Sequence, residues 1–174
     1  MSSRISGSLF SSLRTLLLSA LTVFVMDVSS KQWAMTQLHE GTFAPLIPVL
    51  LGLTLVTNTG TAFGMWRSER LVAMLLPPLI CIAIVAWIIR RQLRGSPLAL
   101  LEQIGFGMVL GGAAGNMLDR LIRGQVTDFL YFPFWPTFPV FNVADALIDV
   151  GVVLIIIQSN RMLKHEKAPT ETDE

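Results

Sequence analysis

Long apolar segments are the feature that most constrains what this chain can fold into. Four stretches come close to the ~20 residues that a helix needs to cross the roughly 30 Å hydrocarbon core of a bilayer. They span about 13–35, 71–89, 97–118 and 140–158. Only 14% of the 174 residues are charged and the mean hydropathy is +0.61, whereas about a quarter of a soluble domain is charged. The sequence therefore predicts an all-α membrane protein with four transmembrane helices.

The first segment has a second interpretation, as a cleavable secretory signal peptide. Arg4 and Arg14 precede its leucine-rich run, as in the basic amino-terminal region of such peptides. The run continues into Asp27 and Lys31 without a clear small-residue cleavage site. These two polar residues favour a helix that is retained.

The distribution of Lys and Arg predicts the orientation of the helices. Of the 13 basic residues, eight fall at the amino terminus, in the second connection and in the carboxyl tail, and five fall elsewhere. By the positive-inside rule both termini are cytoplasmic. The loops of about 36–70 and 119–139 then lie outside, and residues 1–174 form a single membrane domain.

Polar residues inside the apolar segments converge on the outer side of this topology. Ionisable residues within a bilayer are costly and mark a functional site by default, although a structural polar network between helices is the alternative. Gly112, Asn116 and Asp119 are spaced to share one helix face. Nearby, Gly107, Gly111 and Gly115 form a ridge that lets another helix approach closely. The converging residues are Asp27, Lys31, Asn58, Asn116, Asp119, Arg120, Asp128, Asn142 and Asp145.

The residue types in this cluster favour carboxylate chemistry. The two histidines, His39 and His165, begin no HExxH motif and have no Cys or His at metal-ligand spacing, so we expect no metal. A Ser-His-Asp arrangement would depend on His39, and only Ser29 and Ser30 stand near the cluster. Two aspartates brought close hold a single proton near working pH. One can then take a proton from water while the other polarises a carbonyl.

Five motifs resemble, in order and spacing, those of the lipoprotein signal peptidases, the bacterial signal peptidase II family. The resemblance covers nearly the whole chain, and the combination is specific although no single motif is. The motifs are DVSSK from Asp27, NTGTAFG from Asn58, GGAAGNMLDR from Gly111, VTDF from Val126 and FNVAD from Phe141.

The resemblance implies a four-helix aspartyl endopeptidase of the bacterial inner membrane, with no cofactor. Such an enzyme cleaves diacylglyceryl-modified prolipoproteins before their lipidated cysteine, works among membrane lipids and is inhibited by globomycin-type peptides. The catalytic pair of the family falls on Asp128 and Asp145. The supporting residues fall on Asp27, Lys31, Asn58, Gly60, Gly112, Asn116, Asp119, Arg120 and Asn142.

The resemblance also implies a small extracytoplasmic β-sheet, the cradle, in the first outer loop. The stretches LTLVT and TAFGM of that loop are β-prone, and the aromatic segment from Tyr131 to Pro139 is typical of an interfacial loop. Three residues depart from the family pattern: Thr61, Ala146 and Asp149. Asp149 adds a carboxylate one turn from Asp145, and we favour a structural or surface role for it.

Two other classes of function are the alternatives. Intramembrane carboxylates also occur in proton- or ion-coupled transport subunits, but transport favours acids spread in depth or an inverted repeat, and neither is clear here. A non-catalytic scaffold leaves the paired aspartates unexplained. The net charge of +1 does not indicate nucleic acid as a partner.

The predicted orientation can be tested by cysteine labelling in a Cys81-free background. We expect a membrane-impermeant thiol reagent, added to intact cells, to reach Thr137→Cys in the second outer loop and to leave Ser96→Cys in the cytoplasmic connection unlabelled. Labelling of Ser96→Cys alone would reverse the topology. Permeabilised cells, in which both positions react, are the control for accessibility.

Overall fold

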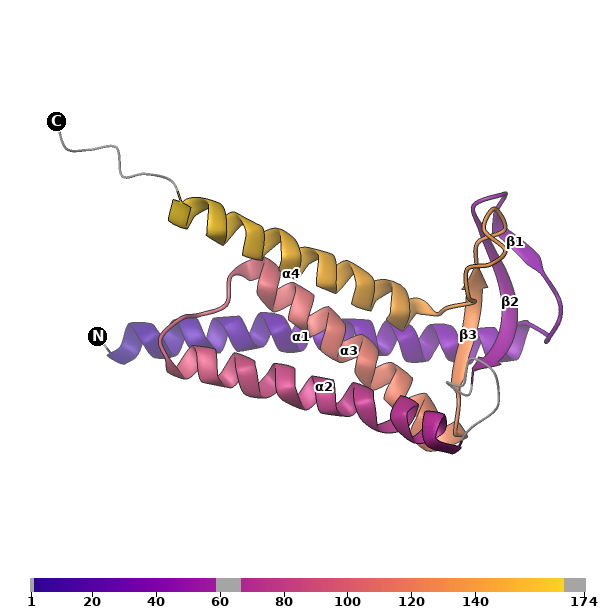
Figure 1. The fold of residues 1–174 in the computed structure, drawn as a ribbon, viewed down its shortest axis with the longest axis horizontal. Coiled ribbons are helices and arrows are strands. Elements are labelled where there is room, and N and C mark those ends of the chain that lie inside the picture. The colour runs from indigo at the N-terminus through magenta and orange to yellow at the C-terminus, as the bar shows by residue number, and fades with distance from the viewer. Residues whose placement is uncertain (1, 59–66, 168–174) are drawn as a thin grey trace.

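The computed structural model describes residues 2–58 and 67–167, and shows four long helices with a small sheet at one end (Figure 1). The amino-terminal end of α1 and the carboxyl-terminal end of α4 lie at the end away from the sheet (Figure 1). The elements are α1 (Ser2–Gln37), β1 (Ala44–Ile47), β2 (Leu51–Asn58), α2 (Arg67–Leu93), α3 (Leu100–Arg123), β3 (Val126–Tyr131) and α4 (Val143–Lys167).

Three stretches in the described residues have the length and apolar composition needed to cross a membrane. They are Leu13–Gln37 in α1, Met74–Leu93 in α2 and Val143–Met162 in α4. Many large apolar side chains on these helices are exposed, as is typical of surfaces that face lipid. The third predicted span, α3, is not among these stretches. Its glycines and residues such as Gln103 and Asn116 lower the mean hydropathy of every membrane-length window within it.

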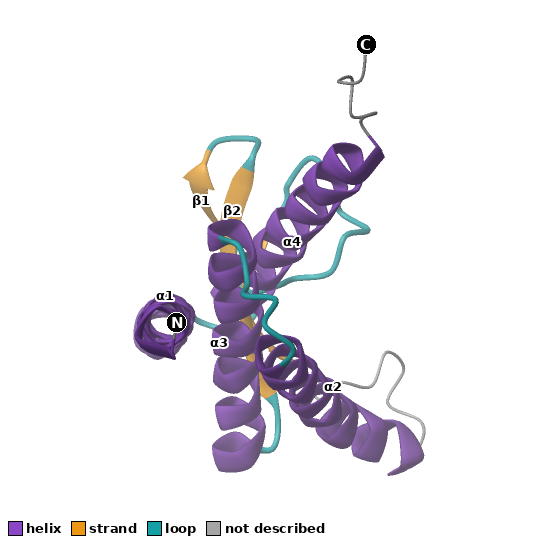
Figure 2. Cartoon of the chain, turned by 90° about the vertical axis from the view of Figure 1, so that its left-hand side faces the viewer, coloured by secondary structure: helices purple, strands orange, loops and turns teal. Residues whose placement is uncertain are grey.

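The glycines and polar residues of α3 fit its place in the middle of the helices. It packs along α1 and α4 and also contacts α2, and Figure 2 shows it with α1 on one side and α2 and α4 diverging on the other. A Cβ atom added at Gly107, Gly111 or Gly115 would collide with α1, at backbone oxygens of Leu16 and Ala20 among other atoms. The predicted glycine ridge is thereby confirmed, and its partner is α1.

The sheet is built from both loops, which corrects the prediction that placed it in the first loop alone. β1 pairs with β2, and β2 pairs with β3, all antiparallel. The predicted LTLVT stretch lies within β2, whereas TAFGM lies outside the described residues. The third strand contains the VTDF motif, whose β character was missed because a six-residue strand that depends on a distant partner gives only a weak local signal.

Two apolar clusters hold these parts together. One joins Leu16 of α1, Ile88 of α2 and Phe106 of α3 to Leu98 in the connection between α2 and α3. The other joins Ala34 near the end of α1 to Leu53 of β2 and Phe129 of β3, which fixes the sheet against the helix end. The carboxylates and amides of the predicted site lie where the sheet meets the helices.

Candidate active site

Asn142 and Asp145 form a reciprocal cap at the start of α4. The backbone N–H of Asp145 donates to Oδ1 of Asn142 at 3.0 Å, and the backbone N–H of Asn142 donates to Oδ2 of Asp145 at 3.3 Å. Asparagine is a favoured first residue for such a cap, and the pattern corresponds to a capping box. The amino end of the helix favours a negative charge at Asp145. The sequence that starts α4 thus also fixes the rotamer of Asp145.

Asp128 lies on β3 with only 2% of its surface exposed. Its Oδ1 accepts a hydrogen bond from Nδ2 of Asn142 at 2.7 Å, and its Oδ2 accepts one from Nδ2 of Asn58 at 2.9 Å. Asn58 reaches Asp128 because it pairs with Val126 in the β2–β3 ladder, two residues before Asp128, and side chains at this diagonal share a face of the sheet. Both oxygens of the buried carboxylate are therefore satisfied.

Asn116 of α3 joins the two aspartates to a buried lysine. Its Nδ2 donates to Oδ1 of Asp145 at 2.8 Å. Its Oδ1 accepts from Nδ2 of Asn142 at 3.0 Å and from Nζ of Lys31 at 2.7 Å. The amide can be oriented in only one way by these partners, since a cation on one side requires the oxygen and a carboxylate on the other requires the nitrogen.

Lys31 and Asp27 bring α1 into the same network. Nζ of Lys31, in a side chain that is almost wholly buried, also donates to Oδ2 of Asp27 at 2.6 Å. The other oxygen of Asp27 accepts the backbone N–H of Ala144 at 3.0 Å. Since Ala144 is in the first turn of α4, Asp27 satisfies one of the backbone donors that a helix start leaves without an internal partner. Asp27 is therefore placed to position α4 from α1.

Asp119 belongs to the network but points toward the start of β3. One oxygen accepts the backbone N–H of Thr127 at 2.9 Å, and the other forms an ion pair with Arg123. Nζ of Lys31 is 3.7 Å from Oδ2 of Asp119, the oxygen that accepts from Thr127. Arg123 was not among the predicted site residues, although its spacing of four from Asp119 on one helix could have identified it.

The remaining predicted residues take different places. Arg120 donates to the backbone oxygen of Asn116 at 3.4 Å, a contact within its own helix. Gly112 allows α3 and α4 to approach, since an added Cβ would lie 2.9 Å from the backbone oxygen of Ala144 and 2.8 Å from Ile148. Gly60 lies outside the described residues.

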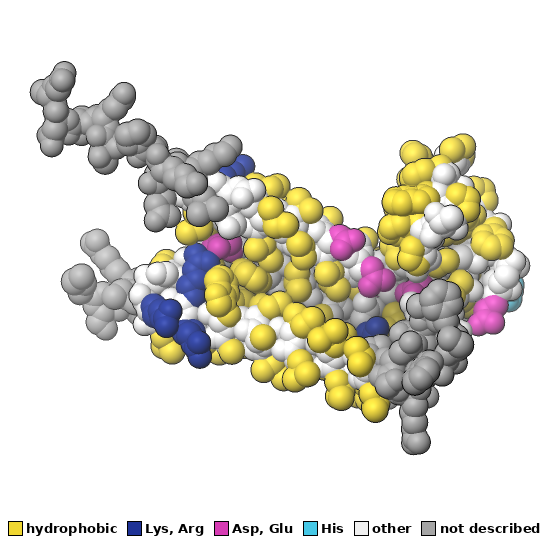
Figure 3. Space-filling model, viewed as in Figure 1, with side chains coloured by type: hydrophobic (Ala, Val, Ile, Leu, Met, Phe, Trp, Pro, Cys, Tyr) yellow, Lys and Arg dark blue, Asp and Glu magenta, His cyan; other side chains and the backbone are white. Residues whose placement is uncertain are grey.

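Asp128 and Asp145 line one cavity of about 400 Å³. Asp149 lies on its rim, one turn along α4 from Asp145, with an exposed side chain. Figure 3 shows acidic side chains along the hollow between the helices and the sheet. The remaining lining residues are Asn58, Ala146 and a mainly aromatic wall from the segment before α4: Phe132, Phe138, Pro139, Val140 and Phe141.

Burial raises the pKa of Asp128 to about 6. The hydrogen bond from Asn58 lowers this pKa, the negative charge of Asp145 raises it, and the hydrogen bond from Asn142 and the positive charge of Lys31 lower it. A carboxyl group with such a pKa is partly protonated near neutral pH. The cavity thus presents a proton donor beside a second carboxylate, the pair that general acid and base catalysis needs. In the described part of the chain, no group of three His, Cys, Asp or Glu residues could hold a metal ion.

Comparison with known proteins places these residues in a family. A family model described as signal peptidase II matches residues 19–161. The lipoprotein signal peptidase of Nostoc punctiforme is 37% identical over 155 residues, covering 89% of this chain and 92% of that protein. That of Neisseria gonorrhoeae is 36% identical, covering 88% and 92%. A solved bacterial membrane enzyme superposes with a TM-score of 0.70 at 30% identity over 83% of this chain and 91% of its own.

The dependence of the site on Lys31 can be tested by its removal. Lys31→Met keeps most of the side-chain volume but leaves Asp27 without its cation. Removing one partner of a buried ion pair lowers the free energy of unfolding by about 3–5 kcal/mol. We expect a marked fall in the Tm of the purified protein in lipid nanodiscs. The double variant Asp27→Leu/Lys31→Met should lose less than the sum of the two single losses.

Gln32→Met is the matched control, because Gln32 neighbours Lys31 in α1 and is exposed. Its Tm should stay near that of the wild type. Strictly additive losses in the double variant would contradict the ion pair.

Proposed function

The chain belongs to the signal peptidase II family, a family of proteases, and on this premise we propose that it is an aspartic endopeptidase that processes lipoproteins. It cleaves the signal peptide of diacylglyceryl-modified prolipoproteins on the N-terminal side of the lipidated cysteine. The observation that carries the proposal is that Asp128 and Asp145 line one cavity and are both hydrogen-bonded to Asn142.

In this mechanism the two aspartates divide the acid and base roles. Asp145, at the amino end of α4, is the ionised base that takes a proton from water as the water oxygen attacks the scissile carbonyl carbon. Asp128, whose pKa is raised, gives its proton to the carbonyl oxygen. Collapse of the tetrahedral intermediate returns that proton to Asp128, and Asp145 protonates the leaving amine. The products are the signal peptide with a new carboxyl group and the free amine of the lipidated cysteine, and both aspartates return to their starting protonation states.

The supporting residues act by position. Asn142 and Asn58 hold Asp128, and Asn116 holds Asp145. Behind these amides, Lys31 donates to Asn116 and lies near Asp119, and Asp27 accepts the backbone N–H of Ala144 in the first turn of α4. Gly112 sets the α3–α4 distance, and Gly60 and Arg120 complete the supporting set by the family resemblance.

We also propose that all four helices cross the bacterial inner membrane, with residues 1–174 forming one peptidase domain. α3, with 24 residues, is about 36 Å long at ~1.5 Å per residue, enough to cross a core of roughly 30 Å. Figure 3 shows Lys and Arg side chains gathered at the end away from the sheet. By the positive-inside rule this end is cytoplasmic, so that the β1–β3 sheet and the catalytic cavity are at the outer face.

The lining of the cavity fits a lipidated substrate. Phe132, Phe138 and Phe141 pack against one another with ring centroids 4.9–5.8 Å apart, and they form an apolar wall beside the aspartates. Such a wall can bury the acyl chains of a diacylglyceryl cysteine or the apolar groups of a globomycin-type peptide. Transport, the alternative drawn from the sequence, has no observation in its favour.

The catalytic pair is tested by cleavage of a purified lipidated prolipoprotein. Asp128→Asn and Asp145→Asn should each abolish nearly all turnover, and the double variant should be scarcely worse, because groups that act as a unit are not additive. Substrate affinity, measured by co-purification, should persist in each. Release of signal peptide by the double variant, or none by the wild type, would refute the proposal.

The pH dependence of the wild-type enzyme follows from the pKa of Asp128. Asp128 is protonated below about pH 6 and ionised above it, so kcat/KM should fall as the pH rises through this value. The hydrogen bond from Asn58 lowers this pKa. Asn58→Ala should therefore raise it and move the alkaline limb of the profile to higher pH.

Thr57→Ala is the control for this shift, since Thr57 is the neighbouring exposed residue of β2. Its profile should match that of the wild type. An alkaline limb that moves to lower pH in Asn58→Ala would mean that the proton does not reside on Asp128.

A further inference from the structure

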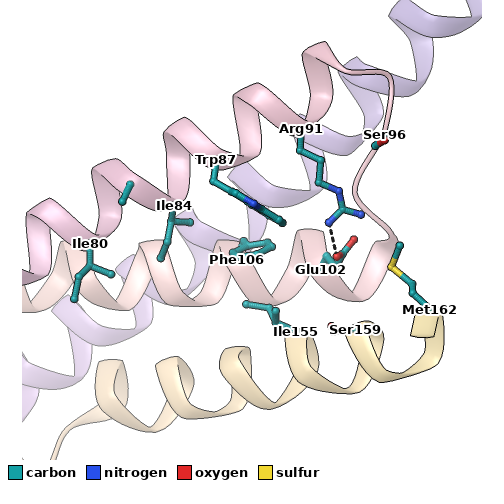
Figure 4. Close-up of a pocket in the computed structure, with 11 residues that line it drawn as sticks. Ile80, Ile84, Trp87, Arg91, Ser96, Glu102, Phe106, Ile155, Ser159 and Met162 are labelled. Carbon is teal, nitrogen blue, oxygen red and sulfur yellow. Dashed lines mark hydrogen bonds and ion pairs between the residues drawn. The ribbon is translucent and has the colours of Figure 1, made fainter. Parts of the chain in front are cut away.

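A second and larger cavity, of about 810 Å³, lies between α2, α3 and α4. Figure 4 shows side chains of all three helices around it, with Ile80, Ile84 and Trp87 from α2 and Ile155 from α4. It is formed where α2 and α4 diverge from α3 (Figure 2). None of its lining residues belongs to the catalytic cavity.

The cavity is apolar along its length and polar at one end. Its polar end holds Arg91 and Glu102, joined by an ion pair of 2.6 Å, together with Ser96 and Ser159. Ile80 and Arg91 are about 16 Å apart along α2 at ~1.5 Å per residue. This is close to half of the roughly 30 Å hydrocarbon core of a bilayer. The cavity therefore has the length and the polarity of one membrane leaflet.

The polar end carries an excess of positive charge. Both oxygens of Glu102 are occupied, one by Arg91 and one by the backbone N–H of Ala99 at 2.8 Å. A guanidinium has five N–H donors, more than this single contact uses. Arg91 also lies 5.3 Å from the ring centroid of Trp87, which orients it. Arg90 in the last turn of α2 and Arg94 just after the helix are exposed beside this end, although they do not line the cavity themselves, and they add to its positive charge.

We infer that this cavity binds an anionic phospholipid, with the phosphate at Arg91 and its neighbouring arginines and one acyl chain between α2 and α4. Ile80 and Trp87 are about half exposed, so the space is open to the surrounding lipid. An apolar space is poorly suited to water, and an acyl chain fills it. Basic pockets between transmembrane helices favour anionic headgroups.

The positive charge of the polar end favours this lipid over the signal peptide of a substrate, which is also long and apolar. A signal peptide begins with a positively charged region, which would lie against Arg90, Arg91 and Arg94 and be repelled by them. A phospholipid phosphate is attracted by the same residues. Because α2 contacts the other helices chiefly through α3, a bound lipid would also connect α2 to α4.

The test is native mass spectrometry of the full-length protein after exchange into nanodiscs of dioleoyl phosphatidylglycerol or of dioleoyl phosphatidylcholine. The wild type should retain one phosphatidylglycerol at least fivefold more than phosphatidylcholine. Ala83→Trp, which fills the cavity from α2, should lose this retention. Val85→Trp adds the same ring on another face of α2, outside the cavity lining, and should keep it.

A second variant tests the headgroup without filling the cavity. Arg90→Gln/Arg94→Gln leaves the Arg91–Glu102 ion pair intact, and it should reduce the preference for phosphatidylglycerol severalfold. If Ala83→Trp fails to fold, this variant decides alone, and an unchanged preference overturns the inference. Three other outcomes would also overturn the inference. They are equal retention of the two lipids by the wild type, equal losses of lipid in the two tryptophan variants, and displacement of phosphatidylglycerol by glycerol 3-phosphate.

Discussion

The candidate site depends on the hydrogen bonds and ion pair made by the buried ammonium group of Lys31. A charge in this position is tolerated only when hydrogen-bonded and paired, and here Asp27 and Asn116 both accept its protons, with Asp119 nearby. Each partner then reaches another element: Asp27 holds the backbone of α4, Asn116 holds Asp145, and Asp119 holds the start of β3. One cation thus fixes the relative positions of three helices and a strand.

The glycines of α3 and the polar network are two parts of one arrangement. A side chain at Gly115 would occupy the space of the Asp27 carboxylate, and one at Gly112 would meet the backbone of α4 at Ala144. Close helix approach therefore brings short polar side chains within hydrogen-bond distance of one another. This explains why α3 can carry buried polar residues along its length, since its neighbours are protein on most sides and its polar groups find partners there.

Sequence patterns predicted the long helices and the set of polar residues, because apolar length and unusual intramembrane polarity are local signals. They missed relations that depend on distant pairing. The alignment of β3 beside β2 brings Asn58 to Asp128 across a separation of 70 residues, and the contact of Asp27 with Ala144 spans 117. The cavity at Arg91 was also missed, because a space between diverging helices has no signature in any one of them.

The antiparallel pairing of β3 has a consequence for how the enzyme acquires activity. Successive residues of a strand face opposite sides, so a slip of one position would turn Asp128 away from Asn142 and present Thr127 or Phe129 in its place. The contacts of Thr127 with Asp119 and of Leu130 with Phe141 exclude that slip from both ends of the strand. In the proposed mechanism, the carboxylate of Asp128 is therefore in place only in correctly registered molecules, and a misregistered chain would lack activity.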